Sequence, residues 1–138
     1  MTEALKRLDG TTLVAGQIQP EDVAGLEVRM LVNNRPDGEE PGQPSSAEME
    51  AAARAAGLGY RHIPIAGGFT EADVEAMAEA LEAGPALAFC RSGTRSTWLW
   101  ALARASRGAD PEALAASAAA AGYDLSPLRA ALAELASR

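Results

Sequence analysis

The residues best suited to chemistry lie together in one loop, Cys90-Arg91-Ser92-Gly93-Thr94-Arg95-Ser96. A nucleophilic cysteine attacks as the thiolate, and a helix amino terminus together with nearby cations favours that form. The loop supplies both, because Gly93 lets successive backbone amides turn inward and Arg95 offers two parallel hydrogen bonds to a tetrahedral oxyanion. We therefore interpret Cys90 as the nucleophile of an anion-binding cradle.

The other polar residues of the loop have supporting roles in this interpretation. Ser96 is expected to donate its hydroxyl hydrogen to the Cys90 sulfur, while Arg91 points outward and sets the field at the mouth of the site. Ser92, Gly93 and Thr94 line the cradle for the substrate anion. A lone cysteine ending an apolar strand is more often a core residue, but this concentration of arginine, serine and glycine favours the catalytic reading.

Candidates outside the loop are weaker. Arg35 and Asp37 follow a predicted strand at its carboxyl end, where ligands bind in open α/β sheets, so they are candidates for substrate binding. The acidic run that continues to Glu39 and Glu40 is more often a solvated loop, but its position at a strand's carboxyl end leaves a contribution to the site open. His62 lies within a predicted strand and is more readily explained as a packed, hydrogen-bonded histidine than as a catalytic base.

The elements that would position these residues alternate between strand and helix. Proline, glycine and capping residues punctuate the apolar segments, and 86–89 is too short for a helix between Pro85 and the glycine loop. This alternation predicts an α/β fold with a small, mostly parallel sheet flanked by helices on both faces. We expect strands at 12–15, 28–33, 60–65 and 86–89, and helices from 20, over 45–56, 70–84, 96–107 and 110–122, and from 126.

Composition narrows the function. With 138 residues, the chain is expected to form one domain, residues 1–138. A net charge of −7 argues against nucleic acid and anionic membrane surfaces as partners, and the absence of a leader or an apolar span predicts a cytoplasmic protein. One cysteine and one histidine exclude an internal disulfide and disfavour a zinc site, so neither a metal nor a cofactor is expected.

Six segments of the sequence, 14–18, 20–22, 33–44, 62–64, 90–96 and 121–124, carry a resemblance to a known family. Through them the sequence resembles the phosphatase-like domain of the beta-lactamase-hydrolase-like protein family over nearly its whole length. The resemblance implies a fold similar to that of dual-specificity and tyrosine phosphatases. It also implies a link to sulfide metabolism, with a persulfide dioxygenase as a partner, because similar domains occur fused to such enzymes.

Two departures from the phosphatase pattern bear on the reaction. Cysteine phosphatases have five residues between cysteine and arginine, whereas four separate Cys90 from Arg95, a length similar to that of rhodanese loops. The segment expected to carry a general-acid aspartate, 66–69, contains no carboxylate. Asp73 is the nearest candidate, but the spacing from Thr70 assigns it to a helix cap.

These departures lead to a prediction of rhodanese-like sulfur transfer through a Cys90 persulfide. Thiosulfate or a small persulfide would donate the sulfur, and a thiol would accept it, because sulfite and thiolates leave without a general acid. The alternative is a cysteine-dependent phosphatase with a phosphocysteine intermediate and Asp37 or Asp73 as the acid. A third possibility is a non-catalytic binder of anions or phosphoproteins.

Overall fold

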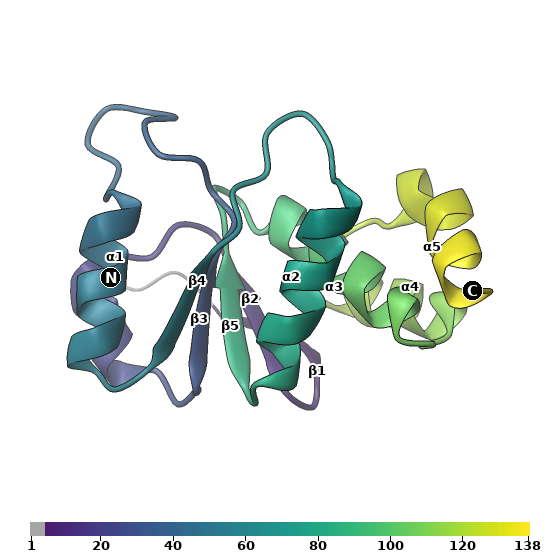
Figure 1. Cartoon of the computed structure of the whole chain (residues 1–138), viewed down its shortest axis with the longest axis horizontal. Helices are drawn as coiled ribbons and strands as arrows, with labels where there is room; N and C mark the ends of the chain where they lie inside the picture. The colour runs from purple at the N-terminus through teal and green to yellow at the C-terminus, as the bar shows by residue number, and fades with distance from the viewer. Residues whose placement is uncertain (1–4) are drawn as a thin grey trace.

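The computed structural model describes residues 5–138 and contains one five-stranded sheet with the strand order β1-β2-β5-β3-β4 (Figure 1). β2, β5, β3 and β4 are parallel neighbours in that order, and β1 joins the edge antiparallel to β2. The predicted fold class is confirmed. The strands are β1 (Lys6–Asp9), β2 (Thr12–Ala15), β3 (Met30–Asn33), β4 (Gly59–His62) and β5 (Ala86–Phe89).

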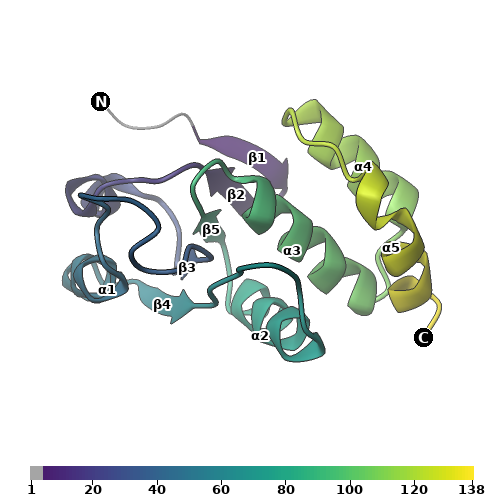
Figure 2. The same ribbon diagram turned by 90° about the horizontal axis from the view of Figure 1, so that it is seen from above.

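Helices cover both faces of the sheet (Figure 2). The 3-10 helix η1 and α1 lie on one face, α2 and α3 lie on the other, and α4 and α5 pack on the outer side of α3. Each face has its own apolar core, and β5 contributes to both because all four of its residues are buried. The helices are η1 (Pro20–Gly25), α1 (Ser46–Ala55), α2 (Glu71–Glu82), α3 (Thr94–Ser106), α4 (Pro111–Ala120), η2 (Ser126–Leu128) and α5 (Arg129–Ala136).

Local sequence signals explain most of these boundaries. Ser45 and Thr70 each form a capping box. The hydroxyl oxygen accepts a hydrogen bond from the backbone N–H three residues later, and the acidic side chain at that position accepts one from the backbone N–H of the serine or threonine. Pro64 lies just beyond β4, an edge strand, as its missing N–H requires. β3 begins at Met30, two residues later than expected, and β4 ends at His62, three residues earlier.

β1 is the one strand that the sequence analysis missed. Its four residues include two exposed basic side chains, and only Leu8 is buried, so the apolar alternation that marks a strand is too short to detect. Charged residues suit an exposed sheet edge. The expectation that residues 1–138 form one domain stays a prediction, and no helix among residues 5–138 is long and apolar enough to cross a membrane.

Candidate active site

Cys90 is fully buried directly after the central strand β5, at the carboxyl end of the sheet. The loop then turns at Gly93, which precedes the first residue of α3 and has a φ of 93°, a left-handed conformation that favours glycine. The backbone N–H of Gly93 donates a hydrogen bond to the Cys90 sulfur, with N and Sγ 3.1 Å apart. The predicted combination of cysteine, inward-facing amide and helix amino terminus is therefore present.

The end of β2 packs directly against this loop. The backbone N–H of Gln17 donates to the Arg91 carbonyl oxygen at 3.3 Å. A Cβ at Gly16 would lie only 2.9 Å from the same oxygen, so a larger residue there would force the two segments apart. Gly16 thus permits the close approach of two backbones that holds Arg91 of the loop against the segment after β2.

Arg95 extends from the first turn of α3 and is held by two other segments. Its guanidinium donates to the Ile65 carbonyl oxygen at 2.8 Å and forms a two-pronged ion pair with Glu39, at 2.7 and 2.9 Å. The hydrogen-bonded Glu39 carboxylate raises the pKa of Arg95 against the effect of burial, and the charge of Cys90 acts in the same direction. Glu39 thus occupies the paired edge of the guanidinium that was expected to face an oxyanion, and Arg95 acts as a fixed cation within electrostatic range of the sulfur.

Glu39 links Arg95 to a second arginine. Arg35 is buried at the carboxyl end of β3, and its Nε donates to Glu39 at 2.8 Å while its Nη2 donates to Glu40 at 2.8 Å. The hydrogen bond from Arg95, followed by that from Arg35, lowers the pKa of Glu39 to about 2, although burial opposes the shift. Glu39 is thus an anion at neutral pH and orients both arginines.

Arg35 therefore has a different role from the one predicted. Its third contact is the Gln17 side-chain oxygen, which accepts from Nη1 at 3.1 Å. All three nitrogens of the guanidinium have protein partners, so Arg35 supports the loop after β3 instead of presenting an open face to an anion.

The loop between β3 and α1 is folded by its own polar side chains. Gln43 donates to the Pro36 carbonyl oxygen at 2.8 Å and accepts from the backbone N–H of Glu39 at 3.1 Å. Asp37, a predicted substrate-binding residue, accepts from the backbone N–H of Ser46 at 2.7 Å at the start of α1. Asp37 thus stabilises the helix start, and its carboxylate is committed there.

The remaining loop residues are arranged around the cradle. Ser96 is buried, and its hydroxyl donates to the Asn34 side-chain oxygen at 2.7 Å, just after the end of β3. The predicted hydrogen bond from Ser96 to the Cys90 sulfur is therefore not formed. Ser92 donates to the Thr94 hydroxyl at 3.1 Å. Arg91 is exposed and lies 3.8 Å from Glu40, in agreement with the expected outward orientation.

Two other titratable candidates are occupied elsewhere. His62 forms a hydrogen bond through Nε2 with the Arg35 carbonyl oxygen at 2.9 Å, as expected of a packed histidine at a sheet edge. Asp73 accepts from the backbone N–H of Thr70 at 3.0 Å and completes the cap of α2. Neither residue contacts the Cys90 loop through these bonds.

Three residues that the sequence analysis did not assign to the site contact it in the structure. Glu39 pairs with Arg95, Asn34 accepts from Ser96, and the Tyr123 hydroxyl donates to the Ser92 carbonyl oxygen at 3.0 Å. Glu39 and Asn34 follow the end of a strand beside β5, a position that signals a contribution to the site. Tyr123 lies in the turn after α4 and has no such signal.

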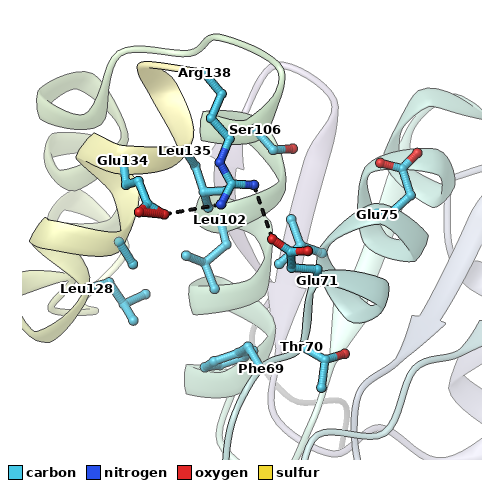
Figure 3. A pocket seen from close by; sticks show the side chains of 12 residues that line it. Phe69, Thr70, Glu71, Glu75, Leu102, Ser106, Leu128, Glu134, Leu135 and Arg138 are labelled. Carbon is cyan, nitrogen blue, oxygen red and sulfur yellow. Dashed lines mark hydrogen bonds and ion pairs between the residues drawn. The ribbon is translucent and has the colours of Figure 1, made fainter.

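One cavity in the described part of the chain lies away from Cys90. It has a volume of about 590 Å³ between α2, α3 and α5, with an apolar floor that includes Leu102, Leu128 and Leu135 (Figure 3). No group of three histidine, cysteine, aspartate or glutamate side chains among residues 5–138 is arranged to hold a metal ion. This cavity is therefore separate from the thiol and the amide at the sheet end.

Comparison with known proteins identifies the family. The model of the phosphatase-like domain of beta-lactamase hydrolase-like proteins matches residues 5–107. The chain belongs to this family. The beta-lactamase hydrolase-like protein of Agrobacterium fabrum is 42% identical over 107 residues, which cover 72% of this chain and 24% of that protein. The chain thus corresponds to about a quarter of the length of this curated relative.

Solved structures of similar shape carry phosphatase descriptions. A candidate phosphatase from Neisseria meningitidis is 31% identical, with a TM-score of 0.78 over 94% of this chain and 96% of that one. The active form of Tk-PTP is 19% identical, with a TM-score of 0.76 over 100% of this chain and 99% of that one, and supports the fold alone. The phosphatase-like domain therefore has the cysteine-phosphatase-like fold that the resemblance implied.

These comparisons overturn the preference for sulfur transfer, which was based on the short interval between Cys90 and Arg95. The rhodanese-like prediction is wrong, and the findings favour its alternative, an enzyme of the phosphatase-like class. Loop length is a poor guide here because the position of Arg95 also depends on Glu39 and on the Ile65 carbonyl, which lie outside the loop.

Proposed function

We propose that this domain is a cysteine-dependent phosphatase that cleaves phosphate monoesters through a phosphocysteine intermediate. The observation that carries the proposal is the arrangement of three groups at the end of β5. The Cys90 sulfur accepts the Gly93 N–H, α3 begins directly behind it, and Glu39 holds Arg95 beside the sulfur. A phosphoryl group above Cys90 would meet the Gly93 amide and the positive charge of Arg95 together.

The reaction would proceed in two displacements at phosphorus. The Cys90 thiolate attacks the phosphorus atom, an S–P bond forms, and the ester P–O bond breaks as the leaving oxygen departs and takes up a proton. A water molecule then attacks the phosphocysteine, the S–P bond breaks, and inorganic phosphate and a proton are released. The thiolate is regenerated, and Arg95 balances charge on the phosphoryl oxygens in both steps.

We expect the substrates to be esters whose leaving group departs without a proton from a general-acid side chain. The segment 66–69 contains no carboxylate, and Asp37 and Asp73 are both committed to helix starts. A positioned general acid accelerates proton transfer by roughly 100- to 10,000-fold, so a strongly basic alkoxide would leave slowly here. Aryl phosphates, including phosphotyrosine side chains, are therefore the proposed substrate class, and a cytoplasmic location is part of the same proposal.

An assay of an aryl and an alkyl phosphate with wild type and Cys90→Ser tests the function. We expect aryl phosphate hydrolysis by wild type, at least about 100-fold slower alkyl phosphate hydrolysis, and no hydrolysis by Cys90→Ser. Rapid acid quenching followed by peptide mass spectrometry should find one phosphoryl group on Cys90. Absence of hydrolysis and of this adduct, in protein shown to be folded, would overturn the proposal.

A further inference from the structure

A single peptide unit connects the candidate nucleophile to a tyrosine from a distant segment. The carbonyl oxygen of Ser92 accepts the Tyr123 hydroxyl hydrogen bond, with the oxygens 3.0 Å apart. The N–H of the same peptide unit belongs to Gly93 and donates to the Cys90 sulfur at 3.1 Å. In a trans peptide the C=O and N–H point in opposite directions, so the unit bridges the tyrosine hydroxyl and the sulfur.

The orientation of the Ser92–Gly93 peptide matters because the reverse orientation would destabilise the thiolate. Rotating the Ser92–Gly93 peptide would remove the N–H from the sulfur and turn the carbonyl oxygen, a partial negative charge, toward it. Gly93 has no Cβ, so its own backbone resists such a rotation less than any other residue would. A hydrogen bond to the carbonyl opposes the rotation, and it also polarises the peptide and strengthens the N–H as a donor.

Tyr123 is well placed to provide that bond. It is half-buried in the turn that follows α4. The centroid of its ring lies 5.1 Å from Lys6 Nζ of β1, and α4 itself contacts β1. The fit to the loop is close, since a Cβ added to Gly93 would come within 2.2 Å of the tyrosine oxygen. Tyr123 also lies beyond residues 5–107, the part that the family model matches.

We propose that Tyr123 is a positioning residue, whose hydroxyl fixes the Ser92–Gly93 peptide so that its N–H stabilises the Cys90 thiolate. The proposal rests on Cys90 reacting as a thiolate, as the proposed function requires. It assigns to the helical segment after residue 107 a direct effect on the reactivity of the loop.

The test is the rate at which iodoacetamide alkylates Cys90, followed by intact mass across a range of pH. Cys90 is the only cysteine, so each added group reports on this sulfur. Tyr123→Phe removes the hydroxyl and keeps the ring. We expect its alkylation rate to fall about tenfold near neutral pH. This factor is roughly what a weakened hydrogen bond from the Gly93 N–H to the charged sulfur would cost. The rates should converge at high pH, where the thiol ionises in every variant.

Trp98→Phe is the matched control. The Trp98 indole N–H donates to the Asp124 carbonyl oxygen at 3.1 Å, so this change loosens the same turn without removing the bond to the loop. We expect alkylation within about twofold of wild type, with both variants shown to be folded by thermal unfolding. A wild-type rate for Tyr123→Phe at every pH, or an equal loss in Trp98→Phe, would overturn the proposal.

Phosphatase kinetics then separate this inference from the proposed function. If both hold, kcat/KM for an aryl phosphate falls in Tyr123→Phe by a factor similar to the alkylation rate. If the domain has no phosphatase activity, the alkylation result still tests the tyrosine, since alkylation requires only the thiolate.

Discussion

Arg35 and Arg138 each pair with two glutamates, but they do so in different surroundings. At the end of β3, Arg35 pairs with Glu39 and Glu40, both at 2.8 Å. At the rim of the large cavity, Arg138 pairs with Glu71 at 3.3 Å and with Glu134 at 3.1 Å (Figure 3). The chemistry of the two clusters is the same, but the Arg35 side chain is 1% exposed and the Arg138 side chain is 55% exposed.

Burial gives the two clusters different consequences. Ion pairs in water contribute little because solvent competes for both partners, whereas a buried guanidinium depends on its protein partners for its hydrogen bonds. Only the buried cluster continues to another functional group, since Glu39 also pairs with Arg95 beside Cys90. The site therefore depends on a buried charge at the sheet end, while the cavity between α2, α3 and α5 has exposed charges at its rim.

The largest expected effect comes from breaking the buried cluster. Arg35→Ala should lower the free energy of unfolding by about 3 kcal/mol, because it removes a buried guanidinium together with its bonds to Glu39 and Gln17. Urea denaturation followed by circular dichroism measures this change. Arg35→Lys retains the charge but not the planar fork, so it should recover only part of the loss. A cost below about 1 kcal/mol for Arg35→Ala would remove the distinction between the clusters.

The second prediction uses pH to test the same cluster at Glu39. Its folded-state pKa, lowered to about 2 from 4.5 by Arg95 and then Arg35, means that the unfolded chain binds this proton more tightly. The stabilisation is therefore complete above about pH 5 and is lost as the pH falls through 4.5 toward 2. Because the Glu39 side chain is 27% exposed, solvent screening reduces the expected loss to about 1 kcal/mol.

Urea denaturation at several pH values, with wild type and Glu39→Gln, measures this loss. The glutamine cannot titrate, so the variant should be less stable at neutral pH and should lose less stability on acidification. Glu71→Gln changes the exposed cluster instead and should retain the wild-type pH dependence. Parallel curves for wild type and Glu39→Gln would mean that Glu39 does not couple to the two arginines in solution.

Much of the fold was predictable because its signals are local. The strand 86–89 was predicted with its observed boundaries, since Pro85 and the glycine loop enclose a run too short for a helix. The caps at Ser45 and Thr70 likewise depend on residues only three positions apart. β1 was missed because an exposed edge strand needs no apolar pattern, and its place depends on pairing with β2.

The candidate site divides in the same way. Cys90 and Arg95 were identified from residue types within a few positions of each other, and the structure brings them together at the start of α3. The partners that orient them are distant in sequence: Glu39 is 56 residues from Arg95, and Tyr123 is 31 residues from Ser92. Nothing in the local sequence of either residue indicates how the loop after β3 folds or where the turn after α4 lies.

The smallest expected effect is at the exposed cluster. Arg138→Ala should change the free energy of unfolding by less than about 0.5 kcal/mol, because water replaces the bonds to Glu71 and Glu134 at little cost. Urea denaturation at low and high salt measures it, and any loss at low salt should disappear at high salt, where exposed charges are screened. A loss that approaches that of Arg35→Ala and persists in salt would show that Arg138 and the cavity wall form one packed unit. The contrast between the two arginines would then depend on something other than exposure.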